Sequence, residues 1–410
     1  MTIWEQLSLP AYWQEFLNYK IDKQHLSAVE QKELETYIAQ EKYLKVLADI
    51  SGEDTILPLP IKKEVNKSGV SKKRVVYSFP KDFSILLKLL TYLLFRYDHL
   101  FARNCYAFRR HYGVKDALRR IRHTKDIHKK YCLKVDISNY FNSIDVPLLL
   151  EKLYFLKEED GAVYDFLVRL LTADKAVYEE NGHLQILTEK RGAMAGTPIS
   201  PFLANVYLME MDHTFEKEGI LYFRYSDDIL IFADTETELA GLQVRLYECI
   251  EAHRLALNPS KVQISRPNEA FEFLGFSFLN HKIDLSPVTI RKMKARIKRK
   301  AHALRRWQHK KGLTGAKAAK GFVKSMNRKF YDNGDGSEFS WSRWFFPCLT
   351  TDEGLKEIDA YMQQYIRYCV TGRHYKGNYR TTYKQMKDWG YRSLVHEFYQ
   401  QFKTINPKEE

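Results

Sequence analysis

The sequence predicts an α+β protein, in which helical segments at both ends of the chain flank a central run of short strands. Residues 1–50, 355–369 and 383–401 have the apolar spacing of helices. Short alternating apolar runs within 57–80 and 221–234 are typical of strands. The chain has 410 residues, of which 45% are hydrophobic, so it is long enough for several domains that each bury a core.

The charge balance indicates a polyanionic partner. The formal net charge of +14 favours binding to nucleic acid or to an anionic membrane surface. Apolar runs such as 83–95 are too short and interrupted to cross a membrane, and the start of the chain shows no export signal. Five scattered cysteines without a CxxC pair argue against a zinc module or a disulfide framework. We therefore expect a cytoplasmic protein that binds nucleic acid.

An acidic helical segment comes first, and basic strands follow it. Residues 1–60 carry ten acidic and five basic side chains, and this segment is expected to pack on the protein or to bind a partner. Strands then flank a basic turn, from which Lys72, Lys73 and Arg74 enter an alternating strand. These cations can reach a phosphate from a rigid backbone, although a solvated basic hairpin fits the pattern equally well.

The segment 101–118 combines aromatic and basic residues after an apolar helix expected over 84–96. Its aromatic side chains are expected to anchor a loop, while Arg103, Arg109 and Arg110 reach out to a triphosphate or a template strand. Arginine suits this task because its planar guanidinium pairs with phosphate oxygens in a bidentate manner.

Three aspartates lie at the ends of apolar strands. Asp136 closes a strand at 133–137, and Asp227 and Asp228 are expected at the exposed tip of a hairpin over 221–234. A structural alternative exists for each, because aspartate commonly forms turns, caps helices or lies solvated in a turn. If the two strands are neighbours, the carboxylates can hold Mg²⁺ together with substrate phosphates. Phe141 can pack back toward the end of the first strand.

The remaining segments add glycines and cations. A Gly- and Pro-rich loop at 191–211 opens a helix, which suits close approach of a ligand or a plain loop-to-helix entry. The other expected elements are a helical stretch at 148–171, a hairpin at 177–187, a helix at 235–253, a strand at 262–265 and an aromatic strand at 271–279. Residues 286–330 contain sixteen Lys or Arg and no Asp or Glu, which favours a cradle for a nucleic-acid backbone over a solvated helix face.

These features together favour nucleotidyl transfer with two Mg²⁺ ions, held by Asp136 and Asp227 and also by Asp228 if it faces the same site. The ions would activate a 3′-hydroxyl and neutralise charge on the triphosphate and pyrophosphate. Positioning and electrostatics would then carry most of the catalysis.

Five motifs occur in order along the chain, namely KVDISNYF, RGAMAGTPISPFLANVYL, FRYSDD, LNPSKVQI and FEFLGF. This series resembles the palm of reverse transcriptases, and more narrowly their bacterial group II intron-like branch. The resemblance implies a right-hand polymerase architecture with fingers, an antiparallel palm sheet, a helical thumb and helical N- and C-terminal extensions. The implied domains are an extension at 1–55, fingers at 56–130, a palm at 131–282 with an insertion at about 148–190, a thumb at 283–345 and an extension at 346–410.

The resemblance also implies roles for individual residues. The catalytic set is Asp136, Asp227, Asp228 and Lys261, with Lys261 as proton donor to pyrophosphate, and Ile137 would add a backbone carbonyl to the metal shell. Phe141 corresponds to the gate that excludes a 2′-hydroxyl. The incoming deoxynucleotide would be held by Lys73, Arg74, Arg109, Phe141, Ala195 and Gly196. The nucleic acid would contact Phe273, Leu274, Gly275, Arg291, Lys294, Lys298 and Arg305.

One motif departs from the family pattern. Where the family has Pro-Gln-Gly, this chain has Met194-Ala195-Gly196, so a methyl group replaces an amide near the nucleotide. Template-independent DNA synthesis by the same site therefore stays open beside templated synthesis. A noncatalytic, maturase-like RNA-binding protein is a third hypothesis, which the three aspartates disfavour.

The flanks narrow the subgroup. The segments MTIWEQLSLPAYWQEFLNYK, YIRYCVTGRHYKGNYR and WGYRSLV look similar to stand-alone bacterial reverse transcriptases associated with antiphage defence. This likeness implies a structured noncoding RNA as template and partner, with Mg²⁺, or Mn²⁺ in its place, and deoxynucleoside triphosphates at the site.

Overall fold

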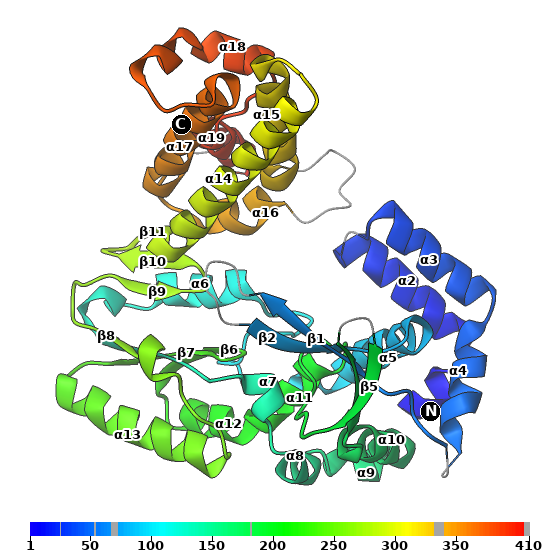
Figure 1. Cartoon of the computed structure of the whole chain (residues 1–410). Helices are drawn as coiled ribbons and strands as arrows, with labels where there is room; N and C mark the ends of the chain where they lie inside the picture. Colours follow the sequence, from blue (N-terminus) through cyan, green and yellow to red (C-terminus); the bar gives the residue numbers. More distant parts are fainter. Residues whose placement is uncertain (25, 53–54, 67–72, 181–182, 332–339, 406–410) are drawn as a thin grey trace. The chain divides into compact units, whose positions relative to one another are not determined.

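The computed structural model describes residues 1–24, 26–52, 55–66, 73–180, 183–331 and 340–405 (Figure 1). The chain forms two compact units, Met1–Glu269 and Ala270–Glu410, and each is described by itself. Lys72 and most of the predicted basic turn lie outside the described residues. The strands that follow residue 270 group with the second unit, whereas the finer domain borders within the units stay predictions.

Helices build the N-terminal region, as predicted. They are α1 (Ile3–Gln6), α2 (Pro10–Gln24), α3 (Ala28–Ala39) and α4 (Lys42–Ser51). Ser27 and Glu30 form a capping box at the start of α3. The buried Trp13 ring of α2 stacks on Tyr43 of α4 with 4.8 Å between centroids, so the two helices share an aromatic core.

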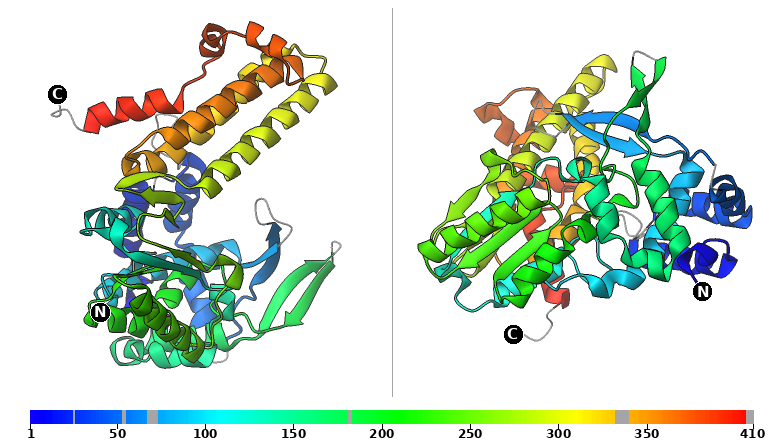
Figure 2. Two further views of the ribbon diagram at one scale, coloured as in Figure 1. Left: turned by 90° about the vertical axis from the view of Figure 1, so that its left-hand side faces the viewer. Right: turned by 90° about the horizontal axis from the view of Figure 1, so that it is seen from below.

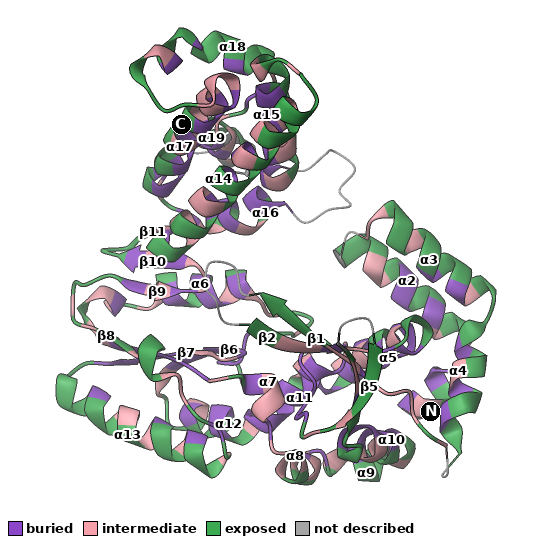
Figure 3. Cartoon of the chain, viewed as in Figure 1, coloured by how far each residue is buried: buried purple, intermediate pink, exposed green. Residues whose placement is uncertain are grey.

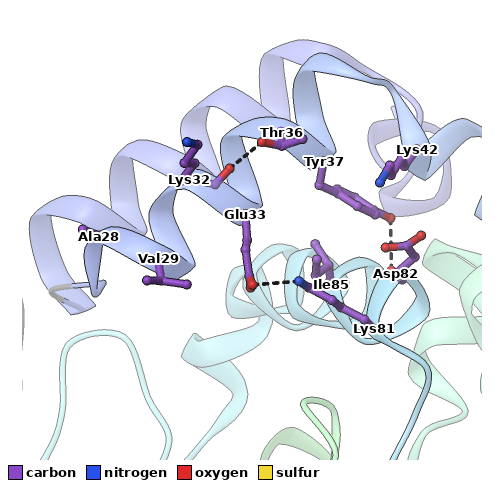
Figure 4. A pocket seen from close by; sticks show the side chains of 10 residues that line it. All are labelled: Ala28, Val29, Lys32, Glu33, Thr36, Tyr37, Lys42, Lys81, Asp82 and Ile85. Atoms are coloured by element: carbon purple, nitrogen blue, oxygen red, sulfur yellow. Dashed lines mark hydrogen bonds and ion pairs between the residues drawn. The ribbon is translucent and has the colours of Figure 1, made fainter.

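A groove of about 570 Å³ lies between α3 and the start of α5 (Lys81–Leu93), and Figure 4 shows its lining. The Tyr37 hydroxyl donates to the Asp82 carbonyl at 3.1 Å, and Lys81 pairs with Glu33 at 2.9 Å. None of the lining residues belongs to the predicted site.

A four-stranded sheet in the first unit has the order β2-β1-β4-β5. Its strands are β1 (Ile61–Asn66), β2 (Lys73–Ser78), β4 (Lys175–Glu180) and β5 (His183–Thr188). The β4–β5 pair confirms the hairpin predicted over 177–187, with its turn at 181–182 outside the described residues.

Three helices replace the single helical stretch predicted over 148–171. They are α8 (Val146–Lys152), α9 (Phe155–Glu159) and α10 (Gly161–Thr172). The break comes at Asp160, whose side chain accepts the Val163 N–H at 3.3 Å and so caps α10. The same carboxylate accepts the Ile3 and Trp4 N–H groups of α1, which ties the N-terminal helices to this region.

The central sheet of the first unit has the order β6-β7-β3-β8. Its strands are β3 (Tyr131–Asp136), β6 (Leu221–Tyr225), β7 (Asp228–Ala233) and β8 (Gln263–Ser265). Ile229, Leu230 and Ile231 are all fully buried, so β7 is covered on both faces (Figure 3). The helices α12 (Met209–Lys217) and α13 (Glu236–Ala252) contact one face of the sheet (Figure 1).

The connections around this sheet carry several site residues. They include a 3₁₀ segment (Leu94–Leu100) after α5, α6 (Val114–His123), α7 (Tyr140–Ser143), α11 (Ser200–Tyr207) and 3₁₀ turns at Ile127–Lys129 and Pro259–Lys261.

The second unit begins with β9 (Phe271–Phe273), β10 (Phe276–Leu279) and β11 (Lys282–Leu285), paired in the order β11-β10-β9. The prediction of a single strand over 271–279 is therefore wrong. Leu274 and Gly275 have φ values of +52° and +89°, so the chain reverses in a tight turn between Phe273 and Phe276.

Helices complete the second unit. They are α14 (Pro287–Lys310), α15 (Gly315–Phe330), α16 (Trp341–Phe345), α17 (Glu353–Thr371), α18 (Tyr383–Asp388) and α19 (Leu394–Ile405), with 3₁₀ turns at Phe346–Cys348 and Lys376–Arg380. The helices α14, α15 and α17 pack side by side (Figure 2). Of the helices in the described ranges, none has the length and apolar character needed to cross a bilayer.

Candidate active site

The ends of β3 and β7 bring the predicted aspartates together. Asp136, the last residue of β3, is the register partner of Asp228, the first residue of β7. Asp227 precedes Asp228 in the turn, and its carbonyl accepts the Ile137 N–H at 3.0 Å. Asp136 and Asp228 are more than ninety residues apart in the sequence. The pairing of the two central strands nevertheless brings all three carboxylates together at one end of these strands.

Burial and charge repulsion raise the pKa values of Asp227 and Asp228. Burial raises the pKa of Asp228 to about 6, and the charges of Asp227 and Asp136 add to this against the opposing charge of Lys134. The pKa of Asp227 is also raised, first by burial and then by Asp136. Burial thus disfavours the charged form of both carboxyls, and a bound cation would favour it.

The turn that carries Asp227 is strained and half-buried. Ser226 has a φ of +61°, a region that a residue with a side chain enters at a cost. Its buried hydroxyl has no hydrogen-bond partner among the described residues. The prediction that hydrophobic burial leaves the two aspartates on an exposed turn is wrong, because both are only partly accessible.

Lys261 reaches the first aspartate from the next motif. Its Nζ pairs with Asp136 Oδ1, and its side chain is 49% exposed. The short turn Pro259–Lys261 is capped by the Asn258 side chain, while the Asn258 N–H donates to the Asp136 carbonyl at 2.8 Å. Backbone and side chain of Asp136 thus hold Lys261 next to the carboxylates.

The predicted cations of β2 differ in their surroundings. Arg74 is exposed. Its positive charge partly opposes the rise in the pKa of Asp227, so its guanidinium is close enough to interact with this carboxylate. Lys73 pairs with Glu64 of β1 at 2.7 Å and stays 60% exposed. Arg74 is therefore the cation of this strand that is best placed for an anionic ligand.

Asn142 joins three parts of the site and was missed at the level of sequence. Its Oδ1 accepts the Ala195 N–H at 2.8 Å, and its Nδ2 donates to the Val75 carbonyl of β2 at 3.1 Å. The Ala195 carbonyl in turn accepts the Tyr77 N–H at 2.7 Å. Ala195 is buried, and both its N–H and its carbonyl are hydrogen-bonded, so it holds β2 against the loop. Of the two loop residues predicted to contact the nucleotide, only Gly196 is exposed.

Phe141 lies beside the same loop. Its carbonyl accepts the Ala193 N–H at 2.8 Å, and a Cβ on Gly192 would lie 2.5 Å from that carbonyl. Only glycine permits this approach, because the φ of Gly192 is +54° as well. The half-buried Phe141 ring stays a predicted gate.

The prediction for Arg109 is wrong, because its guanidinium is buried and occupied. It pairs with Asp98 at 3.1 Å and donates to the carbonyls of Ala102, Cys105 and Asp98. With 4% of its side chain exposed, Arg109 ties the loop together and has no free donor face for a triphosphate. Arg103 and Arg110 are exposed, and Arg110 lies over the rings of Tyr19 and Tyr92.

A buried ion pair supports the aspartate hairpin from behind and was also missed. Arg224 of β6 and Asp212 of α12 are both fully buried, and the Arg224 Nε donates to both Asp212 oxygens at 2.8 and 3.0 Å. The Tyr222 hydroxyl donates to the same carboxylate at 2.9 Å. The sequence does show a charged residue, Arg224, within an apolar strand, which indicates a buried ion pair. It does not show which acidic residue is the partner.

The residues fit divalent metal ions of the Mg²⁺ type in a limited sense. The donors are oxygens only, and the raised pKa values of Asp227 and Asp228 come first from burial, which a bound cation would oppose. Within the described ranges, no group of three His, Cys, Asp or Glu side chains that could hold a metal ion is found. Mg²⁺ is commonly bound by one or two carboxylates together with substrate phosphates.

The predicted nucleic-acid contacts lie in the second unit. Phe273 is fully buried in the β9–β10 hairpin, so of the three residues predicted there only Leu274 and Gly275, in the turn, offer accessible atoms. On α14, Arg291 and Lys298 are exposed.

Two other predicted contacts on α14 are already engaged within the unit. Lys294 pairs with Glu357 at 2.5 Å. Arg305 donates to the Cys369 and Val370 carbonyls at 3.4 Å each, at the end of α17. Fewer cations of α14 are therefore free to bind nucleic acid than the sequence predicted. Arg305 links α14 to the end of α17.

Residues 61–278, just over half of the chain, match the family described as reverse transcriptase (RNA-dependent DNA polymerase). This chain belongs to the reverse transcriptase family. The match contains all three aspartates and Lys261, and it confirms the predicted α+β polymerase fold.

Two curated relatives of this reverse transcriptase family member come from Escherichia coli. The retron Ec86 reverse transcriptase is 26% identical over 106 residues, which are 25% of this chain and 33% of the relative. The retron Ec83 reverse transcriptase is 32% identical over 116 residues, which are 27% of this chain and 35% of the relative. The chain thus matches about a third of the length of these relatives, and the predicted likeness to bacterial reverse transcriptases is confirmed.

Two telomerases are among the solved structures to which this chain shows a distant similarity. The telomerase of Candida albicans with a fragment of telomeric RNA has a TM-score of 0.46 at 14% identity, covering 86% of this chain and 68% of that chain. The apo telomerase of Candida tropicalis has a TM-score of 0.47 at 11% identity, covering 82% and 60%.

Proposed function

We propose that this protein is an RNA-directed DNA polymerase that adds deoxynucleotides at the edge formed by β3 and β7. The observation that carries the proposal is the register pair Asp136 and Asp228, with Asp227 in the adjoining turn, inside the range that matches the family. A structural role alone does not account for three neighbouring carboxylates, two of which, Asp227 and Asp228, have pKa values raised by burial and repulsion.

Each residue has a task that its surroundings support. The three aspartates would hold two Mg²⁺ ions, which supply charge neutralisation and a more acidic 3′-hydroxyl when bound. Lys261, which pairs with Asp136, would donate a proton to the leaving pyrophosphate. Arg74 reaches the triphosphate from β2, and Asn142 keeps that strand against the palm. Phe141 excludes a 2′-hydroxyl by its bulk.

The template is proposed to be a structured noncoding RNA, and the setting bacterial antiphage defence. The retron reverse transcriptases among the relatives support this assignment, as does the resemblance of the flanking segments. A second candidate is template-independent synthesis, which the buried Ala195 methyl group favours because no amide stands in its place.

Two basic surfaces are proposed to hold the nucleic acid. One is the exposed face of α14 with Arg291 and Lys298. The other includes α6 and belongs to the segment 101–130, which contains ten Lys or Arg and only two Asp. A cavity of about 710 Å³ there is lined by Arg103, Tyr106, Tyr112, Asp116, Arg119, Arg120, His123 and Glu216. Removing exposed cations from either surface should flatten the dependence of RNA affinity on salt.

The activity is tested with purified protein, a primed RNA template and the four deoxynucleotides in Mg²⁺. Wild type should extend the primer, and Asp227→Asn should lower the rate by at least about 1000-fold, as expected when a carboxylate that would hold metal is lost. Asp234→Asn is the matched control, because Asp234 lies after β7 at the opposite end of the same strand and is 74% exposed. It should retain nearly full activity.

Each outcome separates the hypotheses. Equal synthesis with and without RNA would favour the template-independent polymerase. RNA binding without any synthesis, unchanged in Asp227→Asn, would favour the noncatalytic protein and refute the proposal.

A further inference from the structure

Phe108 is presented to solvent in an unfavourable backbone conformation. Its φ is +58°, where a bulky aromatic residue is a genuine outlier, and 41% of it is exposed. Burial of the ring therefore does not account for the strain. Strain of this kind persists only where the surroundings enforce it, and it is concentrated at functional sites.

The residues on both sides of Phe108 enforce the conformation. The Ala107 carbonyl accepts the Asn205 Nδ2–H at 2.7 Å, and the Tyr106 N–H donates to the Arg224 carbonyl of β6 at 2.9 Å. On the other side, the buried Arg109 is bound to Asp98 and to three backbone carbonyls. The sequence suggested that aromatics anchor this loop while arginines reach out, but the structure reverses these roles at Phe108 and Arg109.

The ring of Phe108 lies next to the candidate active site. Its centroid is 6.1 Å from that of Phe141, the predicted gate, with the planes at 64°. It is 6.3 Å from the ring of Tyr225, which pairs with Asp228 across the hairpin. Phe108 is thus the exposed member of an aromatic group that joins the gate to the aspartate turn.

We propose that Phe108 is a nucleotide-binding residue that packs against the base of the nucleotide bound beside Phe141. The inference rests on the proposed polymerase function. Aromatic rings stack on any of the four bases, because every base offers a π-face. The clamp around Arg109 holds the ring in place before the nucleotide arrives, so little side-chain freedom is lost on binding.

The test uses the full chain and steady-state incorporation of each deoxynucleotide. Phe108→Gly should raise KM for all four nucleotides about tenfold and leave kcat within about twofold, because the contact is made equally in ground and transition states. Phe108→Tyr should retain a KM close to wild type. Tyr154→Ala is the control, since Tyr154 is another exposed aromatic of the first unit and should leave KM unchanged.

Thermal unfolding provides a readout that does not need activity. Glycine accepts a φ of +58° without strain, so Phe108→Gly should unfold at the same or a higher temperature than wild type. A clear loss of stability would assign the ring to packing and overturn the proposal. An unchanged KM in an active Phe108→Gly protein would overturn it as well, whereas an inactive wild-type protein would refute the polymerase function instead.

Discussion

The ion pair between Asp212 and Arg224 allows the sharpest prediction about stability. Both side chains are fully buried, and the carboxylate also accepts the Tyr222 hydroxyl. Asp212→Asn removes the negative charge but keeps the shape, so Arg224 is left as an uncompensated buried charge. Breaking a buried pair in this way costs about 3–5 kcal/mol. At roughly 2–4 °C per kcal/mol for a unit of this size, the midpoint of thermal unfolding should fall by roughly 10 °C.

The assay is thermal and urea unfolding of the full chain, with Glu218→Gln as the matched control. Glu218 follows the same helix and pairs with Arg245, but these side chains are 42% and 36% exposed. An exposed pair contributes at most about 1 kcal/mol, so the control should shift the midpoint little. If Asp212→Asn destabilises the protein no more than Glu218→Gln, the buried pair does not support the hairpin and the reasoning is refuted.

Three further predictions concern the site and the second unit. Since burial raises the folded-state pKa of Asp228 from 3.8 to about 6, its charge destabilises the metal-free protein above pH 6 and not below pH 4. Asp228→Asn should therefore raise the free energy of unfolding by about 3 kcal/mol at pH 8 in the presence of a chelator, and by little at pH 4. Urea titrations at the two pH values measure this difference, and an equal gain at both would contradict the prediction. Gly315→Ala places a Cβ 2.1 Å from the Val370 carbonyl and should cost at least about 2 kcal/mol in urea unfolding. Gly321→Ala in the same helix, with its nearest contact at 3.9 Å, should instead gain up to about 1 kcal/mol. Phe141→Ala should raise ribonucleotide incorporation at least about tenfold in a competition assay, and unchanged discrimination would remove its role as gate.

The sequence by itself determined the elements whose pattern is local. Alternating apolar residues indicated β3 and the β6–β7 hairpin, because a strand buried on one or both faces must repeat its apolar side chains at the period of the pleat. The same reasoning identified the N-terminal helices and α13. It also selected Asp136, Asp227 and Asp228 as candidates, since their positions at strand ends follow directly from the pattern.

Only the tertiary structure decided which neighbours these residues have. Arg109 and Phe108 are adjacent in the chain, and their roles depend on Asp98, eleven residues earlier, and on a left-handed backbone that no local pattern indicates. Arg305 is engaged by carbonyls more than sixty residues away. Residues distant in the sequence determine whether a cation such as Arg109 or Arg305 is buried or exposed. A buried cation stabilises the fold, whereas an exposed one is free to bind a ligand.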